Sequence, residues 1–222
     1  MLARRCAWRR RIVRGSPMPL HNRVTPFGEI VADPSRGTLM GNRGILHNER
    51  GELGQARWRH SHWVACLLDF RGRQRMVMAP RHYTELFFLD EATALAAGHR
   101  PCAECRNADY RRFRAAFARG HGLDQPPAAK DLDARLHADR VGPGRRQRTR
   151  MAPATALPAG TMIALAGQPF LVWGGRMRPW SFAGYGAAQD LPAGDAEVLT
   201  PWGTVLALGA GYVPMVHPSA GD

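Results

Sequence analysis

The sequence predicts an α+β protein: a small antiparallel sheet with two short helices around a Cys-x-x-Cys pair, followed by a small β-rich domain closed by one helix. Three observations predict this class. Short apolar runs separated by Gly, Pro, Asn and Asp fill the first third of the chain, helical patterns stand on both sides of the cysteine pair, and short apolar runs return after two stretches rich in Pro and Gly. With 222 residues and 45% hydrophobic content, the chain is long enough to bury a core.

The first third of the chain is predicted to form short strands. Apolar residues there are grouped in runs of three to eight residues, and turn-forming residues separate the runs. The segment 70–73 predicts a hairpin turn between the last two strands, because Gly72 can adopt a positive φ. The predicted strands span 29–32, 38–40, 63–70 and 74–78.

Two helices are predicted around the cysteine pair. Asp90 can accept hydrogen bonds from the first free N–H groups of a helix over 91–97, and Gly98 can supply the left-handed residue that ends it. Asn107 is expected to cap a second helix that runs to about residue 119. The spacing of its apolar residues favours a buried stripe, although the aromatic rings could also stack on nucleobases. The stripe consists of Tyr110, Phe113, Ala116 and Phe117.

Two Pro- and Gly-rich stretches divide the chain. They have the composition of linkers, and a short helix over 131–140 is expected between them. Beyond them, apolar runs predict strands at 161–165 and 169–173, and Thr200 and Pro201 predict the N-cap and first residue of a helix over 202–208. The expected organisation is a basic leader at 1–17, a cysteine-knuckle domain at 18–119, a linker region at 120–156 and a β-rich domain at 157–222.

The formal charge of +13 favours a polyanionic partner such as DNA or RNA, because basic side chains neutralise phosphates. The leader holds six arginines and no acid, so the charge without it is +7; it is expected to be disordered or to precede a true start at Met18. The basic residues are 30 arginines and Lys130, a bias that GC-rich codon usage could also produce. No apolar run reaches the roughly 18 residues of a membrane span, and the leader lacks the apolar segment of a secretion signal, so a cytoplasmic protein without membrane association is expected.

Cys102 and Cys105 are the residues most indicative of chemistry. Two cysteines separated by two residues can place both sulfurs on one metal ion, and the same spacing also serves thioredoxin-like redox sites. A redox pair would begin a helix directly after a buried parallel strand, whereas this pair follows a predicted helix and its glycine stop. The context therefore favours a zinc knuckle, with loss of the metal and simple packing as the alternative.

The segment around this pair resembles the metal-binding domain of Ada-type DNA repair proteins. Residues 87–106, FFLDEATALAAGHRPCAECR, share with it a phenylalanine pair, an Ala-rich helix and a Gly-x-Arg-Pro-Cys-x-x-Cys-Arg run. The resemblance covers about twenty of the 222 residues. It implies a zinc site of four thiolates, the first two in an upstream Cys-x-x-x-Cys, of which the first accepts a methyl group from a DNA phosphotriester.

The upstream half of that ligand set differs in this chain. Outside the leader, the single upstream cysteine is Cys66, and His62 stands four residues before it. A set of His62, Cys66, Cys102 and Cys105 would give a Cys3His zinc site, and because His62 then takes the place of the methyl acceptor, methyl transfer is not expected. Alternatives stay open: Cys66 could be a core cysteine of its strand, and the rival histidine ligands are His60, His82 and His99.

The leading hypothesis is a zinc-containing nucleic-acid-binding protein that acts in DNA repair or processing. Arginines flank the knuckle and recur in the linker region, where they could neutralise phosphates. One alternative is a zinc-dependent hydrolase or nuclease with an open metal position, held by Cys66, Cys102 and Cys105. Another is a structural or interaction protein whose metal only holds the fold or is lost. The candidate phosphate contacts are Arg100, Arg106, Arg111, Arg112, Arg145, Arg146 and Arg148.

Overall fold

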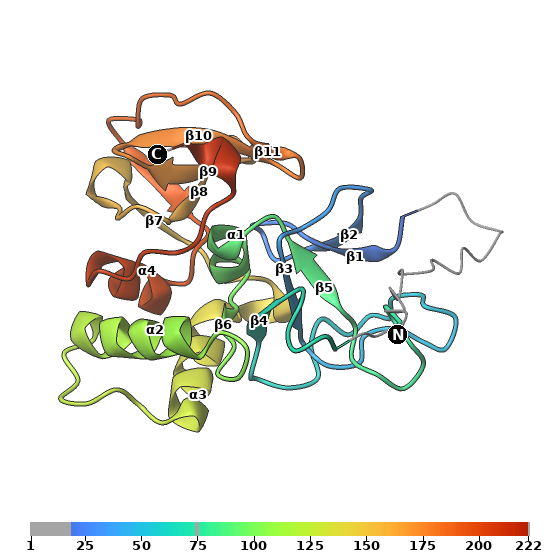
Figure 1. Ribbon diagram of the computed structural model, residues 1–222. Helices are drawn as coiled ribbons and strands as arrows, with labels where there is room; N and C mark the ends of the chain where they lie inside the picture. The colour runs from blue at the N-terminus through green and yellow to red at the C-terminus, as the bar shows by residue number, and fades with distance from the viewer. Residues whose placement is uncertain (1–18, 74–75, 222) are drawn as a thin grey trace, which may run out of the picture.

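The computed structural model describes residues 19–73 and 76–221. The leader predicted at 1–17 and the first two residues of the strand predicted at 74–78 lie outside these ranges. Within them the chain forms an α+β structure with two six-stranded sheets and four α-helices (Figure 1). The coarse class predicted from the sequence is therefore confirmed.

The first sheet is mixed rather than antiparallel. Its strand order is β2-β1-β5-β3-β4-β6, and the pairs β1 with β5 and β4 with β6 run parallel. The expectation of a purely antiparallel sheet was wrong because helix α1 lies between β5 and β6 and carries the chain back to β4 in the parallel direction. The strands are β1 (His21–Val24), β2 (Ile30–Ala32), β3 (Leu39–Asn42), β4 (Val64–Leu67), β5 (Leu86–Phe88) and β6 (Arg100–Pro101).

The hairpin predicted near residue 72 is present only as a turn. The N–H of Arg73 donates to the carbonyl of Phe70, and Gly72 adopts φ +64°, as expected for a tight turn. The strand before this turn ends at Leu67, however, and residues 76–78 belong to no strand. The described part of the predicted partner strand, residues 76–78, is therefore not paired in a hairpin.

The helices lie close to their predicted positions, but two predicted caps are wrong. The helices are α1 (Glu91–Ala96), α2 (Asn107–Gly120), α3 (Ala129–Arg140) and α4 (Trp202–Gly209). Asn107 is the first residue of α2 and donates its side-chain amide to the carbonyl of Ala103. Thr200 does not cap α4, because its hydroxyl accepts the N–H of Met162. The predicted stripe of α2 is buried, which confirms it as a core face.

The second sheet is antiparallel, with the order β11-β10-β9-β8-β12-β7. Its edge strand β7 lies in the segment predicted as a linker, and three 3-10 turns join the remaining segments at Pro143–Arg145, Ala154–Ala156 and Pro218–Ala220. The strands are β7 (Arg150–Pro153), β8 (Met162–Leu165), β9 (Gln168–Trp173), β10 (Arg176–Ser181), β11 (Gly184–Tyr185) and β12 (Asp195–Val198).

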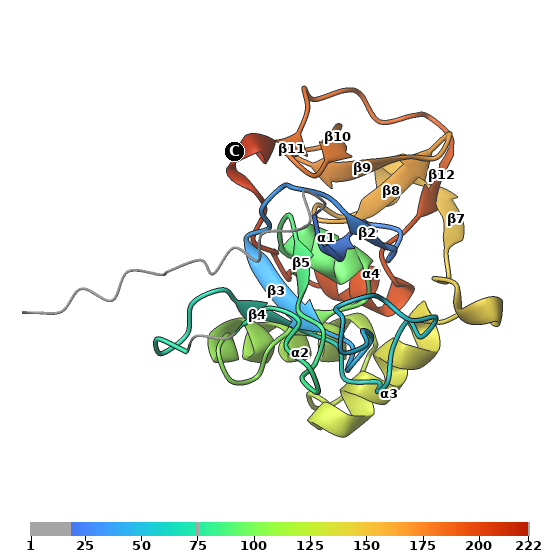
Figure 2. The same ribbon diagram turned by 90° about the vertical axis from the view of Figure 1, so that its right-hand side faces the viewer.

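The hydrophobic cores cross the divisions that composition suggested. Leu89, just before α1, and Ala92, within it, share a cluster with Leu171 and Trp180 of the second sheet. A second cluster combines side chains of α2, α3 and α4. Figures 1 and 2 show α1 at the centre of the molecule, where the two sheets approach each other. The two parts are therefore packed together through α1.

Buried charges hold the start of α1. Asp90 is fully buried; it caps the helix by accepting the N–H of Thr93, and it also accepts the hydroxyl of Tyr185 and the N–H of His217. The neighbouring Glu91 is 1% exposed and accepts bonds from Arg106, the hydroxyl of Tyr212 and the N–H of Met215. Both carboxylates thus connect α1 to the C-terminal segment.

Replacing Glu91 tests this connection. We expect Glu91→Gln to lower the free energy of unfolding by about 3 kcal/mol, because it removes one partner of an ion pair whose side chains are each 2% exposed. Glu49→Gln is the matched control; Glu49 is exposed, so its change should stay within about 0.5 kcal/mol. Urea denaturation followed by circular dichroism measures both, and equal midpoints would contradict the role assigned to Glu91.

Candidate metal centre

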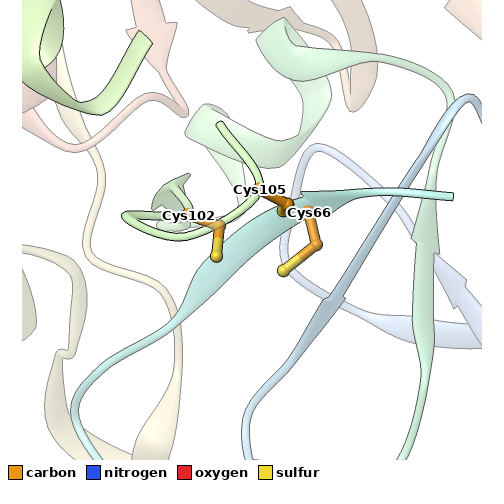
Figure 3. Close-up of side chains that lie close together, drawn as sticks. All are labelled: Cys66, Cys102 and Cys105. Carbon is orange, nitrogen blue, oxygen red and sulfur yellow. The ribbon is translucent and has the colours of Figure 1, made fainter. Parts of the chain in front are cut away.

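Three cysteines from two distant segments meet at one point. Cys66 comes from β4, and Cys102 and Cys105 come from the turn between β6 and α2. Their sulfurs lie within 4.8 Å of one another, and Figure 3 shows the three side chains gathered at this turn. Tetrahedral zinc with bonds of about 2.3 Å holds its sulfurs about 3.8 Å apart, so small side-chain rotations would close the site.

The pairing of β4 with β6 brings the three cysteines together. Val64 is paired with Arg100 and Ala65 with Pro101, and the N–H of Cys102 donates to the carbonyl of Ala65 over 3.0 Å. This register places the next residue of β4, Cys66, beside Cys102. The knuckle then closes when the N–H of Arg106 donates to the carbonyl of Cys102.

Backbone N–H groups point at two of the sulfurs. The N–H of Glu104 donates to Sγ of Cys102, and the N–H of Leu67 donates to Sγ of Cys105, each over 3.4 Å. Hydrogen bonds of this kind favour the charged thiolate over the neutral thiol. A turn that directs N–H groups at its own sulfurs is suited to holding thiolates on a metal ion.

The three thiols differ in acidity. The pKa of Cys102 falls to about 5, because its sulfur accepts a hydrogen bond from the Cys66 thiol and further bonds from backbone N–H groups. The pKa of Cys66 rises, because its thiol donates to Cys102 and is partly buried, and burial also raises the pKa of Cys105. In the metal-free protein the first thiolate therefore forms at Cys102. All three side chains remain partly exposed, so a metal ion can reach them.

His62 does not join the cysteine cluster. Its ring stacks on His60 with centroids 3.7 Å apart, and Nε2 of His60 bonds to the side chain of Asn42. His82 bonds to a backbone carbonyl, and His99 is buried against the ring of Phe88. The structure thus brings together three of the four predicted ligands. His62 lies two residues before β4, and the extended backbone from Val64 to Cys66 separates it from the cluster.

Two of the arginines expected to contact phosphates are buried in ion pairs instead. Arg100 makes two bonds of 2.8 Å to the carboxylate of Asp133, and Arg106 bonds to Glu91 and Asp109. Arg100 is 5% exposed and Arg106 is 4% exposed, so their guanidinium groups are occupied by carboxylates within the fold. Asp133 lies on α3 and Glu91 on α1, far in sequence from Arg100 in β6 and Arg106 before α2, so no local pattern indicates these pairs.

The other five predicted arginines are exposed. Arg111 and Arg112 lie on α2, where Arg112 pairs with Asp109. The remaining three, Arg145, Arg146 and Arg148, follow α3 in the segment before β7. These exposed guanidinium groups can reach a phosphate.

Comparisons with known proteins give no match from which a function could be inferred. No family model matches the chain, and no curated protein or solved structure is significantly similar to it. None of the described helices is long and apolar enough to cross a membrane. The three-cysteine cluster is consequently the strongest functional feature so far, and it is consistent with a metal site.

The acidity of Cys102 can be measured directly. In metal-free protein, the rate of alkylation by iodoacetamide at Cys102 should rise with pH through a midpoint of about 5, because the thiolate is the nucleophile and its pKa is lowered. Cys66 and Cys105 serve as internal controls and should react only at higher pH, since their pKa values are raised. Peptide mass spectrometry gives the three rates; equal rates at neutral pH would contradict the arrangement.

Proposed function

We propose that this chain is a zinc-containing nucleic-acid-binding protein in which Cys66, Cys102 and Cys105 hold the metal. The observation that carries the metal half is the convergence of three sulfurs within 4.8 Å, two of them already receiving backbone N–H groups. Thiolate ligands select soft and borderline ions, and a Cys-x-x-Cys turn with tetrahedral spacing favours zinc among them. A reducing compartment such as the cytoplasm suits three free thiols.

Zinc at this site would reinforce the first sheet. Cys66 is separated from the knuckle by a long segment, so a shared ion would cross-link β4 to the turn before α2. Binding would also release protons from the thiols of Cys66 and Cys105, whose pKa values are raised in its absence. Metal affinity is therefore expected to fall as the pH is lowered.

Charge and sequence resemblance support the nucleic-acid half of the proposal. The formal charge is +13, and five of the predicted arginines are exposed. The Ada-like run at 87–106 supports a role in DNA repair or processing, with DNA and RNA both open as partners. Sequence-independent contacts with the phosphate backbone make such binding strongly dependent on salt.

A zinc-dependent hydrolase or nuclease is the second candidate. It is favoured by one observation: within the described ranges, the cluster supplies three ligands rather than four. Zinc with a free fourth position acts as a Lewis acid toward whatever binds there. Cys6, the remaining cysteine of the chain, lies outside the described residues.

Elemental analysis tests the metal half. Protein purified without chelator should contain about one zinc ion per chain, and Cys102→Ser should lose most of it, because one of three thiolates is removed. His62→Ala decides whether the histidine moves onto the metal, with His82→Ala as the matched control. If His62→Ala loses zinc and His82→Ala keeps it, His62 is the fourth ligand. Wild-type protein without zinc would contradict the proposal.

Two further readouts separate the candidates. Nucleic-acid binding should weaken steeply with salt in the zinc-loaded protein. Hydrolysis of a phosphodiester that stops on chelation, and that is absent in a folded Cys102→Ser variant, would favour the hydrolase. Melting on chelation with no affinity for DNA or RNA would mean that the metal only holds the fold.

A further inference from the structure

A strongly basic cleft lies apart from the cysteine cluster. It has a volume of about 940 Å³, and none of the three cysteines lines it. The turn before β2, the end of α3 and the segment between α3 and β7 form its walls. Its lining includes five arginines and two carboxylates, Glu29 and Glu197. The arginines are Arg43, Arg57, Arg140, Arg145 and Arg146.

Two of these arginines are buried against one tryptophan. Arg43 is 3% exposed and Arg140 is 2% exposed, and their guanidinium carbons lie 4.3 Å and 3.8 Å from the ring centroid of Trp63. Arg43 donates to the carbonyls of Gly28 and Ala97. Arg140 donates to backbone carbonyls as well, and its buried Nε has no hydrogen-bond partner among the described residues. Neutral carbonyls therefore hold both cations.

Among the described residues, no carboxylate bonds to either guanidinium group of this buried pair. Asp133 is the nearby acid that acts on Arg140, but both of its oxygens are already bound to Arg100. Burial and the charge of Arg57 lower the pKa of Arg43 to about 9, which still leaves it protonated at neutral pH. Burial and the two guanidinium charges also keep His99 neutral by lowering its pKa. Burial and the charge of Arg43 also lower the pKa of Arg140, but a guanidinium group keeps its proton in proteins. The bottom of the cleft thus holds two guanidinium groups that have no bonded carboxylate among the described residues.

Three exposed arginines extend the charge to the opening of the cleft. Arg57, Arg145 and Arg146 form no ion pair with any described residue. Of the two acids, Glu197 accepts the hydroxyl of Thr149, and Glu29 is exposed. Five cations against two anions in a concave site concentrate a positive field, and guanidinium groups match phosphate oxygens in geometry.

We propose that this cleft binds the phosphate groups of a nucleotide or of a nucleic-acid strand. The volume is within the range of small-molecule sites and is large enough for a nucleotide. Trp63 is covered by the two arginines and is 5% exposed, so the site recognises phosphate rather than stacking a base. Binding of a nucleic-acid strand in the cleft rests on the proposed function, whereas binding of a nucleotide is independent of it.

Charge reversal at the opening tests the cleft without disturbing its buried arginines. The variant carries Arg57→Glu, Arg145→Glu and Arg146→Glu, and the matched control carries Arg36→Glu, Arg50→Glu and Arg135→Glu, all exposed residues outside the cleft. Melting followed by circular dichroism verifies that both are folded. The probes are a fluorescein-labelled single-stranded DNA oligonucleotide, its duplex, adenosine monophosphate and inorganic phosphate, each titrated over a range of salt.

We expect the cleft variant to bind its ligand at least about tenfold more weakly than the control, with a salt slope reduced by about three. Binding of the monophosphate, in competition with the oligonucleotide, identifies a nucleotide site; binding of oligonucleotides alone identifies a nucleic-acid site. If no probe binds wild-type protein, or if both variants bind equally well, the cleft proposal is overturned. Oligonucleotide binding unchanged in the cleft variant would overturn the cleft alone and leave the proposed function standing.

Arginine modification gives an independent readout. Phenylglyoxal labelling, followed by peptide mass spectrometry, should show that the bound probe protects Arg57, Arg145 and Arg146 but not Arg36, Arg50 or Arg135. Equal protection of the two sets would mean diffuse electrostatic binding over the surface and would contradict a defined site.

Discussion

The structure depends on one short helix whose two ends are held by buried side chains from distant parts of the chain. A helix of six residues satisfies few of its own N–H and C=O groups, so most need partners from elsewhere when the helix is buried. At its start, Asp90 caps the helix, and carboxylates there also favour the positive end of the helix dipole. At its end, the carbonyls of Ala96, Ala97 and Gly98 accept bonds from Gln147, Arg43 and Arg140, respectively.

These contacts explain how the same helix positions both the cysteine cluster and the cleft. Gly98 ends α1 with φ +82°, and the chain then passes directly through β6 into the cysteine knuckle. Arg106, the residue after Cys105, bonds back to Glu91 at the start of α1, so the knuckle is fixed on both sides. The arginines at the other end of α1 are the ones that line the cleft. A change in α1 would therefore reach both sites.

Local features of this architecture could be predicted from the sequence, whereas the distant partners could not. The cap at Asp90, the left-handed Gly98 and the buried stripe of α2 depend on neighbouring residues and were confirmed. The mixed sheet was missed because strand direction depends on how α1 crosses between strands. Nothing in the local sequence distinguishes Arg43 and Arg140 from the other arginines. Their burial beside Trp63 could not be predicted, because tertiary packing sets it. Cys66 lies beside Cys102 and Cys105, as the sequence predicted. His62, the predicted fourth ligand, stacks on His60 instead.

The electrostatics of the two sites favour different roles for them. Zinc bound by three thiolates carries a net charge of about −1, and the nearest buried arginines, Arg100 and Arg106, are already neutralised by carboxylates. A phosphodiester approaching that site would meet a negative centre. The cleft has the opposite character, because its buried guanidinium groups are bound to neutral carbonyls rather than to carboxylates. A metal ion at the three cysteines would therefore act mainly on the fold, by cross-linking β4 to the knuckle, whereas the cleft is the better site for the phosphate binding proposed above.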